Sequence, residues 1–420
     1  MKDRLFEFVN SSIGSIVLIF LGILMIIEAN FVLPFARVIL IVALVVLTIV
    51  HLFNLIFDKK KHFRHLMFYI FYILLVYCIY EYPGAYIKFH GYIIGIYALI
   101  NAMIMVIDYF VARDNHETDL VSRIVKIIIY LVFAIALFII PYRSTSLVFA
   151  ISGIYLVIFG GLQLISNIKQ LSNKKFNLAI SVPVLLSAII PVSLFFKVRN
   201  NHEVYEHLDD NPYDDQIAPL EINIYVQSGG FESFGHLDIS IDGTIYSYGC
   251  HDPNGRTLFG AVGDGVLIKV KRSDFLENAM KTKKTMIFNF SLNPDAEVMD
   301  SIRHRLDSLM QDAVPFDCAA RKQELANEPM TAEDYISDVY KDTHCELYKF
   351  KDGRFKRYFV FTTNCVLLSD YLIRNNEIDL FNMNGIVTPG AYLNYLFQLY
   401  VKKDSIIKSL RIYKKSQKQK

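Results

Sequence analysis

Residues 234–241 read FGHLDISI and residues 362–370 read TTNCVLLSD, and these two segments decide how the second half of the chain is interpreted. The first is a glycine followed by an alternating strand with His236 at its start. The second is a polar turn that leads into a helix with Cys365 at its first position. A cysteine at a helix start opposite a strand histidine is a known arrangement for nucleophilic catalysis. The two segments therefore predict a thiol site in a mixed α+β domain.

The chemistry of such a site requires Cys365 to ionise. The unpaired N–H groups at a helix N-terminus lower the pKa of a thiol there, and Asn364 stands at the N-cap position. His236 would accept the thiol proton, and Gly235 leaves space beside it. The backbone N–H of Cys365 would form one arm of an oxyanion hole, with Asn364 and Gly235 as neighbours of the substrate.

A third polar group should orient the imidazole, and the sequence offers alternatives. Asp242 and Gly243 predict a tight hairpin turn, so the next strand should lie beside His236 and bring Ser247 or Tyr248 within its reach. Asp238 is a rival, because it lies two residues further along the same strand face. The ordinary interpretation also stands, since a single strand histidine is usually structural and a free cysteine usually behaves as a small buried hydrophobe. The competing cysteines outside the apolar half are Cys250, Cys318 and Cys345.

The remaining pattern of the second half alternates between the periods of strands and helices. Strands are expected at 221–228, 236–242, 244–248, 264–271, 284–291 and 355–361. Helices are expected at 273–281, with Ser273 as its N-cap, and at 294–312, 331–341 and 386–400. This is the pattern of an α+β domain with an antiparallel sheet.

The first half of the chain is dominated by apolar runs that are long enough to cross a bilayer. They predict about seven membrane spans, at 12–28, 34–57, 66–82, 91–111, 124–141, 146–166 and 177–197. The first run lacks a small-residue cleavage site, so it is expected to be a retained anchor. The fold class is therefore multi-domain, with an all-α polytopic membrane domain followed by the α+β domain.

The first six spans pair into hairpins that recur every 50–60 residues or so, which suggests a threefold repeat. Each pair is split by a short turn that is polar or contains proline. This layout resembles the HdeD-like membrane family, over about residues 12–170. The resemblance implies a bundle of six short helices, and a non-enzymatic role in a stress response.

Lysine and arginine in the short loops predict the orientation of the membrane domain. Most of them fall in the N-terminal segment, the 58–65 loop, the loop after the fourth span and the loop near residue 170. These are expected to be cytoplasmic, and seven crossings then place residues 200–420 outside the cytoplasm. The expected location is the cell membrane, with several passes.

The domain boundaries follow from the same composition. The chain divides into a membrane domain at 1–198, an acidic juxtamembrane linker at 199–220, the thiol domain at 221–400 and a basic tail at 401–420. The linker has two histidines but no paired ligand spacing, so no metal and no cofactor are expected. The net charge of +2 says nothing about nucleic acid, but no basic face interleaved with aromatic residues appears before the short tail, so no nucleic-acid partner is expected.

At the residues already quoted, the chain resembles the circularly permuted NlpC-type superfamily of papain-like thiol enzymes. The matching segments are 234–236 (FGH), 245–249 (IYSYG) and 363–365 (TNC), within about 221–400. The branch that it resembles includes lipoprotein N-acyltransferases of the bacterial envelope. This resemblance implies that His236 is the base and Cys365 the nucleophile. Members often have His, Glu or Asp where this chain has Ser247.

Three functions remain open at this point. The first is an extracytoplasmic acyltransferase that moves an acyl chain from a phospholipid, through a thioester on Cys365, to an amine such as a lipoprotein N-terminus. The second is a cell-wall amidase or endopeptidase with the same Cys–His pair. The third is an HdeD-like membrane protein without enzymatic activity. The expected partners are membrane phospholipid, a lipoprotein or cell-wall peptide, and a second membrane protein.

Overall fold

The computed structural model describes most of the chain. The described residues are 2–57, 62–139, 145–171, 208–209, 217–227, 235–281, 285–373 and 406–414, with Tyr392, Leu393, Leu396 and Tyr400. The predicted span at 177–197, the histidines of the acidic linker and the predicted helix at 386–400, apart from those four residues, lie outside them. The chain forms two compact units, each of which is described by itself.

The first unit is helical. Its helices are α1 (Lys2–Ile27), α2 (Ala29–Phe57), α3 (His62–Glu81), most of α4 (Pro83–Asp114), α5 (Leu120–Ile139) and α6 (Thr145–Leu171). Within the described residues, three helices are long and apolar enough to cross a membrane, namely Arg37–Ile56, Gly91–Asp114 and Leu120–Ile139. Shorter apolar segments lie in α1, α3 and α6. Six of the seven predicted runs therefore correspond to helices in the structure.

Helices α1 and α6 pack closely because small residues face each other across their contact. A Cβ atom added to Gly22 would lie 2.6 Å from the carbonyl oxygen of Gly153, and one added to Gly160 would lie 2.8 Å from that of Ser15. A Cβ added to the neighbouring Gly161 would meet nothing within 4 Å. Glycine on the contact side is thus required by the approach of two backbones.

This difference gives a matched test of the helix contact. Gly160→Ala should destabilise the protein by about 1–3 kcal/mol, because the new methyl group has no room between the backbones. Gly161→Ala should be neutral or slightly stabilising, because alanine is the better helix former. Thermal unfolding of the two full-length variants in detergent would measure the difference. Equal melting temperatures would contradict the close packing of α1 on α6.

The second unit is built on a nine-stranded sheet with the order β1-β11-β7-β2-β3-β4-β6-β9-β8. All neighbouring pairs in it are antiparallel except β1 with β11. Its strands are β1 (Leu208–Asp209), β2 (Leu220–Gln227), β3 (His236–Ile241), β4 (Thr244–Gly249), β6 (Val266–Lys271), β7 (Thr285–Leu292), β8 (Ala313–Pro315), β9 (Glu346–Phe350) and β11 (Ile407–Lys414). A second, two-stranded sheet pairs β5 (Val262–Asp264) with β10 (Arg357–Phe359).

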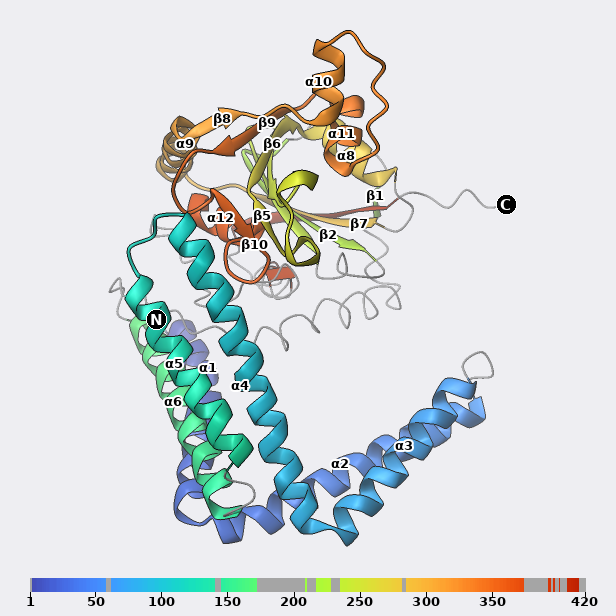
Figure 1. Ribbon diagram of the computed structural model, residues 1–420, viewed down its shortest axis with the longest axis vertical. Helices are drawn as coiled ribbons and strands as arrows, with labels where there is room; N and C mark the ends of the chain where they lie inside the picture. Colours follow the sequence, from blue (N-terminus) through green and yellow to red (C-terminus); the bar gives the residue numbers. More distant parts are fainter. Residues whose placement is uncertain are drawn as a thin grey trace. The chain divides into compact units, whose positions relative to one another are not determined.

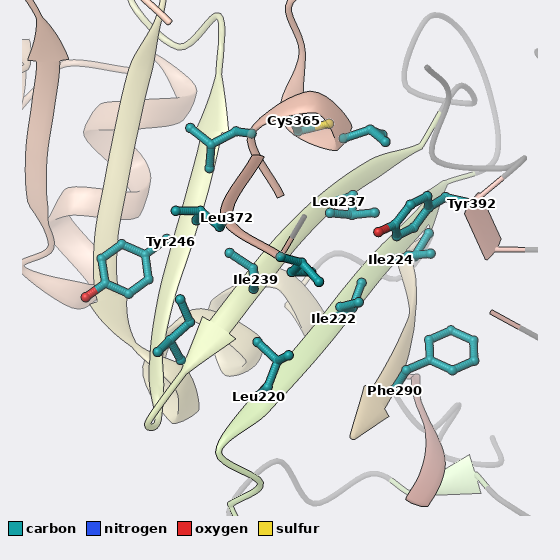
Figure 2. Packing of buried hydrophobic residues seen from close by; sticks show 14 of the residues in the cluster. Leu220, Ile222, Ile224, Leu237, Ile239, Tyr246, Phe290, Cys365, Leu372 and Tyr392 are labelled. Carbon is teal, nitrogen blue, oxygen red and sulfur yellow. The ribbon is translucent and has the colours of Figure 1, made fainter. Parts of the chain in front are cut away.

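Helices cover both faces of the large sheet (Figure 1). One apolar cluster joins the sheet to α9 (Ala296–Gln311) and α12 (Cys365–Ile373). The other joins it to α8 (Arg272–Met280), α10 (Ala319–Leu325) and α11 (Tyr335–Thr343). The first cluster is the larger one, and it holds Leu237, Ile239 and Cys365 (Figure 2). The domain is therefore α+β, with an antiparallel sheet between two layers of helices.

Several predicted elements are confirmed. The hairpin turn lies between β3 and β4, where Asp242 and Gly243 both have positive φ, at 49° and 78°. Strand β10 leads into the helix that starts at Cys365. Ser273 is not the N-cap of α8, however, because the helix already starts at Arg272, so that Lys271 occupies the cap position. The short strands β1, β5 and β8, the longer β9 and the helix α10 were not predicted.

The predicted basic tail is wrong for residues 407–414. They form β11, which pairs with β7 on one side and with β1 on the other. Ile412 and Tyr413 in this strand are buried, at 1% and 0% exposure. Leu410 and Ile412 lie in the larger apolar cluster and Tyr413 in the other, so β11 contributes to the core on both faces of the sheet. The charges between these residues hid the strand in the sequence.

The turn after α4 belongs to the second unit rather than to the first. The Asn115 side chain donates to the carbonyl oxygen of Arg354 and accepts from the backbone N–H of Arg357, both at 2.8 Å. The sequence analysis expected this turn in the cytoplasm and residues 200–420 outside it. Residues that contact each other cannot lie on opposite faces of a membrane, so these two expectations are not compatible with the contacts of Asn115.

Candidate active site

The start of α12 has the predicted cap. The Asn364 Oδ1 atom accepts a hydrogen bond from the backbone N–H of Leu367 at 3.1 Å, as an N-cap side chain does. Its Nδ2 atom donates to the carbonyl oxygen of Val360 at 2.9 Å. Asn364 therefore fixes the turn that sets Cys365 at the first helical position. Both ends of the amide bind backbone groups, so Asn364 caps the helix, and its contact with a substrate stays a prediction.

The Cys365 thiol is enclosed by the sheet and the helix start. Its side chain is 4% exposed and belongs to the apolar cluster that also holds Leu237 and Ile239 of β3 (Figure 2). Burial raises the pKa of the Cys365 thiol to about 11, and the backbone N–H groups of Leu237, Val366 and Cys365 itself act in the opposite direction. The helix terminus favours the thiolate as expected, but desolvation is the larger effect.

His236 directs its imidazole to a different neighbour. The Nε2 atom lies 2.7 Å from the Oγ atom of Ser247 on β4, a contact that was predicted as one of two alternatives. Burial lowers the pKa of His236 to about 4, so the imidazole is neutral at pH 7 and can accept a proton. The preceding residue, Gly235, has a φ of 79°, a backbone conformation that favours glycine.

The predicted hydrogen bond between His236 and Cys365 is not made among the residues that the structure describes. Successive side chains of a strand point to opposite faces. Cys365 packs with Leu237, in one apolar cluster, whereas the His236 ring lies against Tyr225, which belongs to the other (centroids 5.8 Å apart). The thiol interacts instead with the backbone N–H of Leu237, and Leu237 is the residue that follows His236.

The other predicted orienting groups have different partners. The Tyr248 hydroxyl donates to the carbonyl oxygen of Phe355 at 2.8 Å, on the Cys365 side of the sheet. Asp238 is fully buried and accepts from the Asn223 Nδ2 atom at 2.8 Å. Burial raises the pKa of Asp238 to about 7. Of Ser247, Tyr248 and Asp238, only Ser247 contacts the imidazole.

His251 is part of this neighbourhood, although the sequence analysis gave it no role. Its ring stands 6.1 Å from the His236 ring and 5.2 Å from that of Tyr335, measured between centroids. Its Nε2 atom is buried without a hydrogen-bond partner among the described residues, and burial lowers the pKa of His251 to about 3. The sequence shows only a glycine two residues earlier, and the structure explains it, because a Cβ added to Gly249 would lie 2.4 Å from His251 Nε2.

Two of the competing cysteines, Cys318 and Cys345, are buried in the domain. All five cysteines of the chain are free thiols. Cys318 occupies the N-cap position of α10, a helix start that the sequence did not reveal, and it is 2% exposed. Burial raises the pKa of Cys345 to about 11. Among the described residues, no group of three or more His, Cys, Asp or Glu side chains could hold a metal ion.

The thiol environment predicts slow alkylation of Cys365. The sequence alone led to the opposite expectation, a thiol that reacts well below a pKa of about 8.5. With a pKa of about 11, Cys365 is protonated at pH 8, so iodoacetamide should modify it at least tenfold more slowly than a free thiol. Mass spectrometry of the native protein across pH 7–11 would follow the rate. Half-maximal reactivity near pH 7 would contradict the closed geometry.

Asp238 predicts a pH dependence of stability. Its pKa is raised from 3.8 to about 7, so between these values the folded state holds a proton that the unfolded state has released. Its contribution to stability is full below pH 4 and is lost as the pH rises towards 7, on the order of 1 kcal/mol per pH unit. Asp238→Asn should remove this part of the dependence.

The measurement is the difference between thermal unfolding profiles of wild type and Asp238→Asn in detergent from pH 4 to 7. His236 works in the opposite direction, because its lowered pKa makes the folded state less stable as the pH falls from 6.5 towards 4. The difference between the two proteins cancels that effect. Parallel profiles would contradict the raised pKa of Asp238.

Comparison with known proteins places only the first half of the chain. Residues 70–139 and 125–196 match a family described as a short repeat of unknown function, DUF308. No curated protein and no solved structure matches the chain significantly. The two matched stretches cover less than half of the chain and agree with the repeats predicted there. Together with the three apolar helices, they support a membrane domain in the N-terminal half.

Proposed function

We propose that the protein is a membrane-anchored thiol acyltransferase, in which Cys365 takes an acyl group from a membrane phospholipid and passes it to an amine. The observation that carries the proposal is the position of the thiol. Cys365 starts a helix capped by Asn364 and interacts with the N–H of Leu237, the residue next to His236. The apolar helices of the first unit would hold the domain near its lipid substrate.

The reaction would proceed in two steps. The Cys365 thiol attacks the carbonyl carbon of a phospholipid ester, while a neutral imidazole takes the thiol proton and gives it to the departing alcohol oxygen. The resulting thioester is then attacked by the amine, which loses a proton as the amide forms and the thiol is restored. The backbone N–H groups of Leu237 and Cys365, beside the sulfur, are the candidates for stabilising the oxyanion.

The reaction requires a second arrangement of the site. Cys365 must become accessible to an ester, and the His236 imidazole must leave Ser247 and turn towards the sulfur. Both groups are neutral in the closed arrangement, because their burial shifts the two pKa values apart. Binding of a lipid chain between α12 and the sheet would supply the opening, and the Ser247 contact would hold the imidazole until then.

The second candidate is a membrane protein without enzymatic activity. Two observations favour it, namely the match of residues 70–196 to the DUF308 repeat and the closed state of the thiol. In that case Cys365 is a packing residue of the large apolar cluster, and the His236–Ser247 contact satisfies two buried polar groups. This candidate needs no change of the structure. Neither observation favours a cell-wall amidase.

The two candidates differ in whether Cys365 becomes acylated. The purified full-length protein would be incubated in vesicles of phospholipid with labelled acyl chains, and the Cys365 peptide examined by mass spectrometry. We expect a label that neutral hydroxylamine releases, as it does from thioesters. Cys365→Ala should lose the label entirely, and His236→Ala should reduce it at least 100-fold.

Cys318→Ala is the matched control, since Cys318 is a free, buried thiol at another helix start. This variant should keep the label. An unlabelled Cys365 in the wild-type protein, with the vesicles intact and the protein folded, would sink the enzymatic proposal and leave the membrane protein without catalysis.

A further inference from the structure

The turn at residues 115–119 is fixed at one face of the membrane by its two neighbours. The segment before it, Gly91–Asp114, and the one after it, Leu120–Ile139, are both long and apolar enough to cross. A turn of this length between two spans cannot enter the apolar interior, because its backbone groups would lose their hydrogen bonds to water. Anything that binds the turn must therefore be on the same face.

The C-terminal domain binds this turn through specific contacts. Asn115 is 1% exposed, and its amide joins the carbonyl oxygen of Arg354 to the backbone N–H of Arg357. The neighbouring His116 Nδ1 atom lies 2.6 Å from the Asp352 Oδ1 atom. Two hydrogen bonds from one buried amide require an asparagine-like geometry, so this is a built contact and not a chance approach of two surfaces.

We infer that the C-terminal domain lies on the same membrane face as the 115–119 turn and that this face is cytoplasmic. The loop at 58–61 lies two helices before the turn, so the two share a face when α3 and α4 both cross. That loop contains Lys59, Lys60 and Lys61, and such clusters are retained in the cytoplasm. The chain must then cross the membrane an even number of times between Leu120 and Leu208.

This inference is independent of the thiol chemistry, but it restricts the substrates. A site on the cytoplasmic side draws phospholipid from the inner leaflet and amines from the cytoplasm. Lipoprotein N-termini on the outer face of the membrane and cell-wall peptides would lie across the bilayer from Cys365. With the N-terminus in the cytoplasm, as the lysine and arginine pattern predicts, the inference also requires an even number of spans in place of seven.

The test is the accessibility of single cysteines in intact cells. Thr118→Cys in the turn, Glu328→Cys in the C-terminal domain and Tyr82→Cys between α3 and α4 would be introduced separately into a full-length chain that lacks its own cysteines. All three positions are exposed. A membrane-impermeant maleimide should label Tyr82→Cys in intact cells, and should label Thr118→Cys and Glu328→Cys only after permeabilisation.

Either of two results would overturn the inference. Labelling of Glu328→Cys but not of Thr118→Cys in intact cells would separate the domain from the turn. Labelling of both in intact cells would place the shared face outside. A fusion of green fluorescent protein to the C-terminus of the unaltered chain gives a second measurement, because this reporter is expected to fluoresce only when it is cytoplasmic.

The contact itself is tested by a disulfide. The pair His116→Cys and Asp352→Cys replaces two side chains whose atoms lie 2.6 Å apart, and both are exposed at the surface. Mild oxidation of the full-length double variant should join them, as a shift in electrophoretic mobility that dithiothreitol reverses. The two single variants are the controls. Failure of both this disulfide and a cross-link with a short bis-maleimide in the folded double variant would contradict the contact on which the inference rests.

Discussion

The alternation of side chains along β3 governs the whole candidate site. Leu237 and Ile239 face α12 and bury the Cys365 thiol, whereas His236 and Asp238 face the other layer of helices. A step of one residue along the strand thus separates the two groups that thiol catalysis would combine. The thiol interacts with the backbone N–H of Leu237, so the sulfur lies beside the residue that follows His236 although the imidazole points to the other face.

The second face of the central strands is unusual because it is both polar and buried. Glu221, Asn223, Asp238 and Asn289 have no exposed surface, and a chain of hydrogen bonds links the last three. Glu221 forms a buried ion pair with Arg272, at 2.5 Å, and Arg272 also donates to the Tyr413 hydroxyl. Buried polar groups of this kind tolerate the loss of a partner poorly. They fix the register of β2, β3 and β7, and they attach β11 to the edge of α8.

The sequence predicted the parts of the site that depend on local signals. The asparagine cap of α12, the Asp242–Gly243 turn and the start of β3 all follow from residues close together in the chain. The contact of His236 with Ser247 followed from the pairing of two strands across that turn. The position of Cys365 relative to the imidazole could not be predicted in this way. It depends on which face of the sheet α12 covers, and that is decided by packing across 129 residues of chain (365 − 236). The same limit hid β11, whose partner β7 is far away in sequence.

The Asn115–Arg354 contact joins residues 239 positions apart, and α5 and α6 lie within the segment that it closes. The loop around Arg354 leads through β10 to Cys365, and Phe355 in this loop packs in the same apolar cluster as the thiol, so the distant turn is held next to the surroundings of the candidate site. Contacts of such long range form slowly, because the entropy of the intervening chain must be lost first. With the turn and the domain on one membrane face, as we infer, insertion of the apolar helices would shorten this search. We therefore expect membrane insertion to precede closure of the thiol site in this protein, because one buried amide ties the turn to the loop before β10.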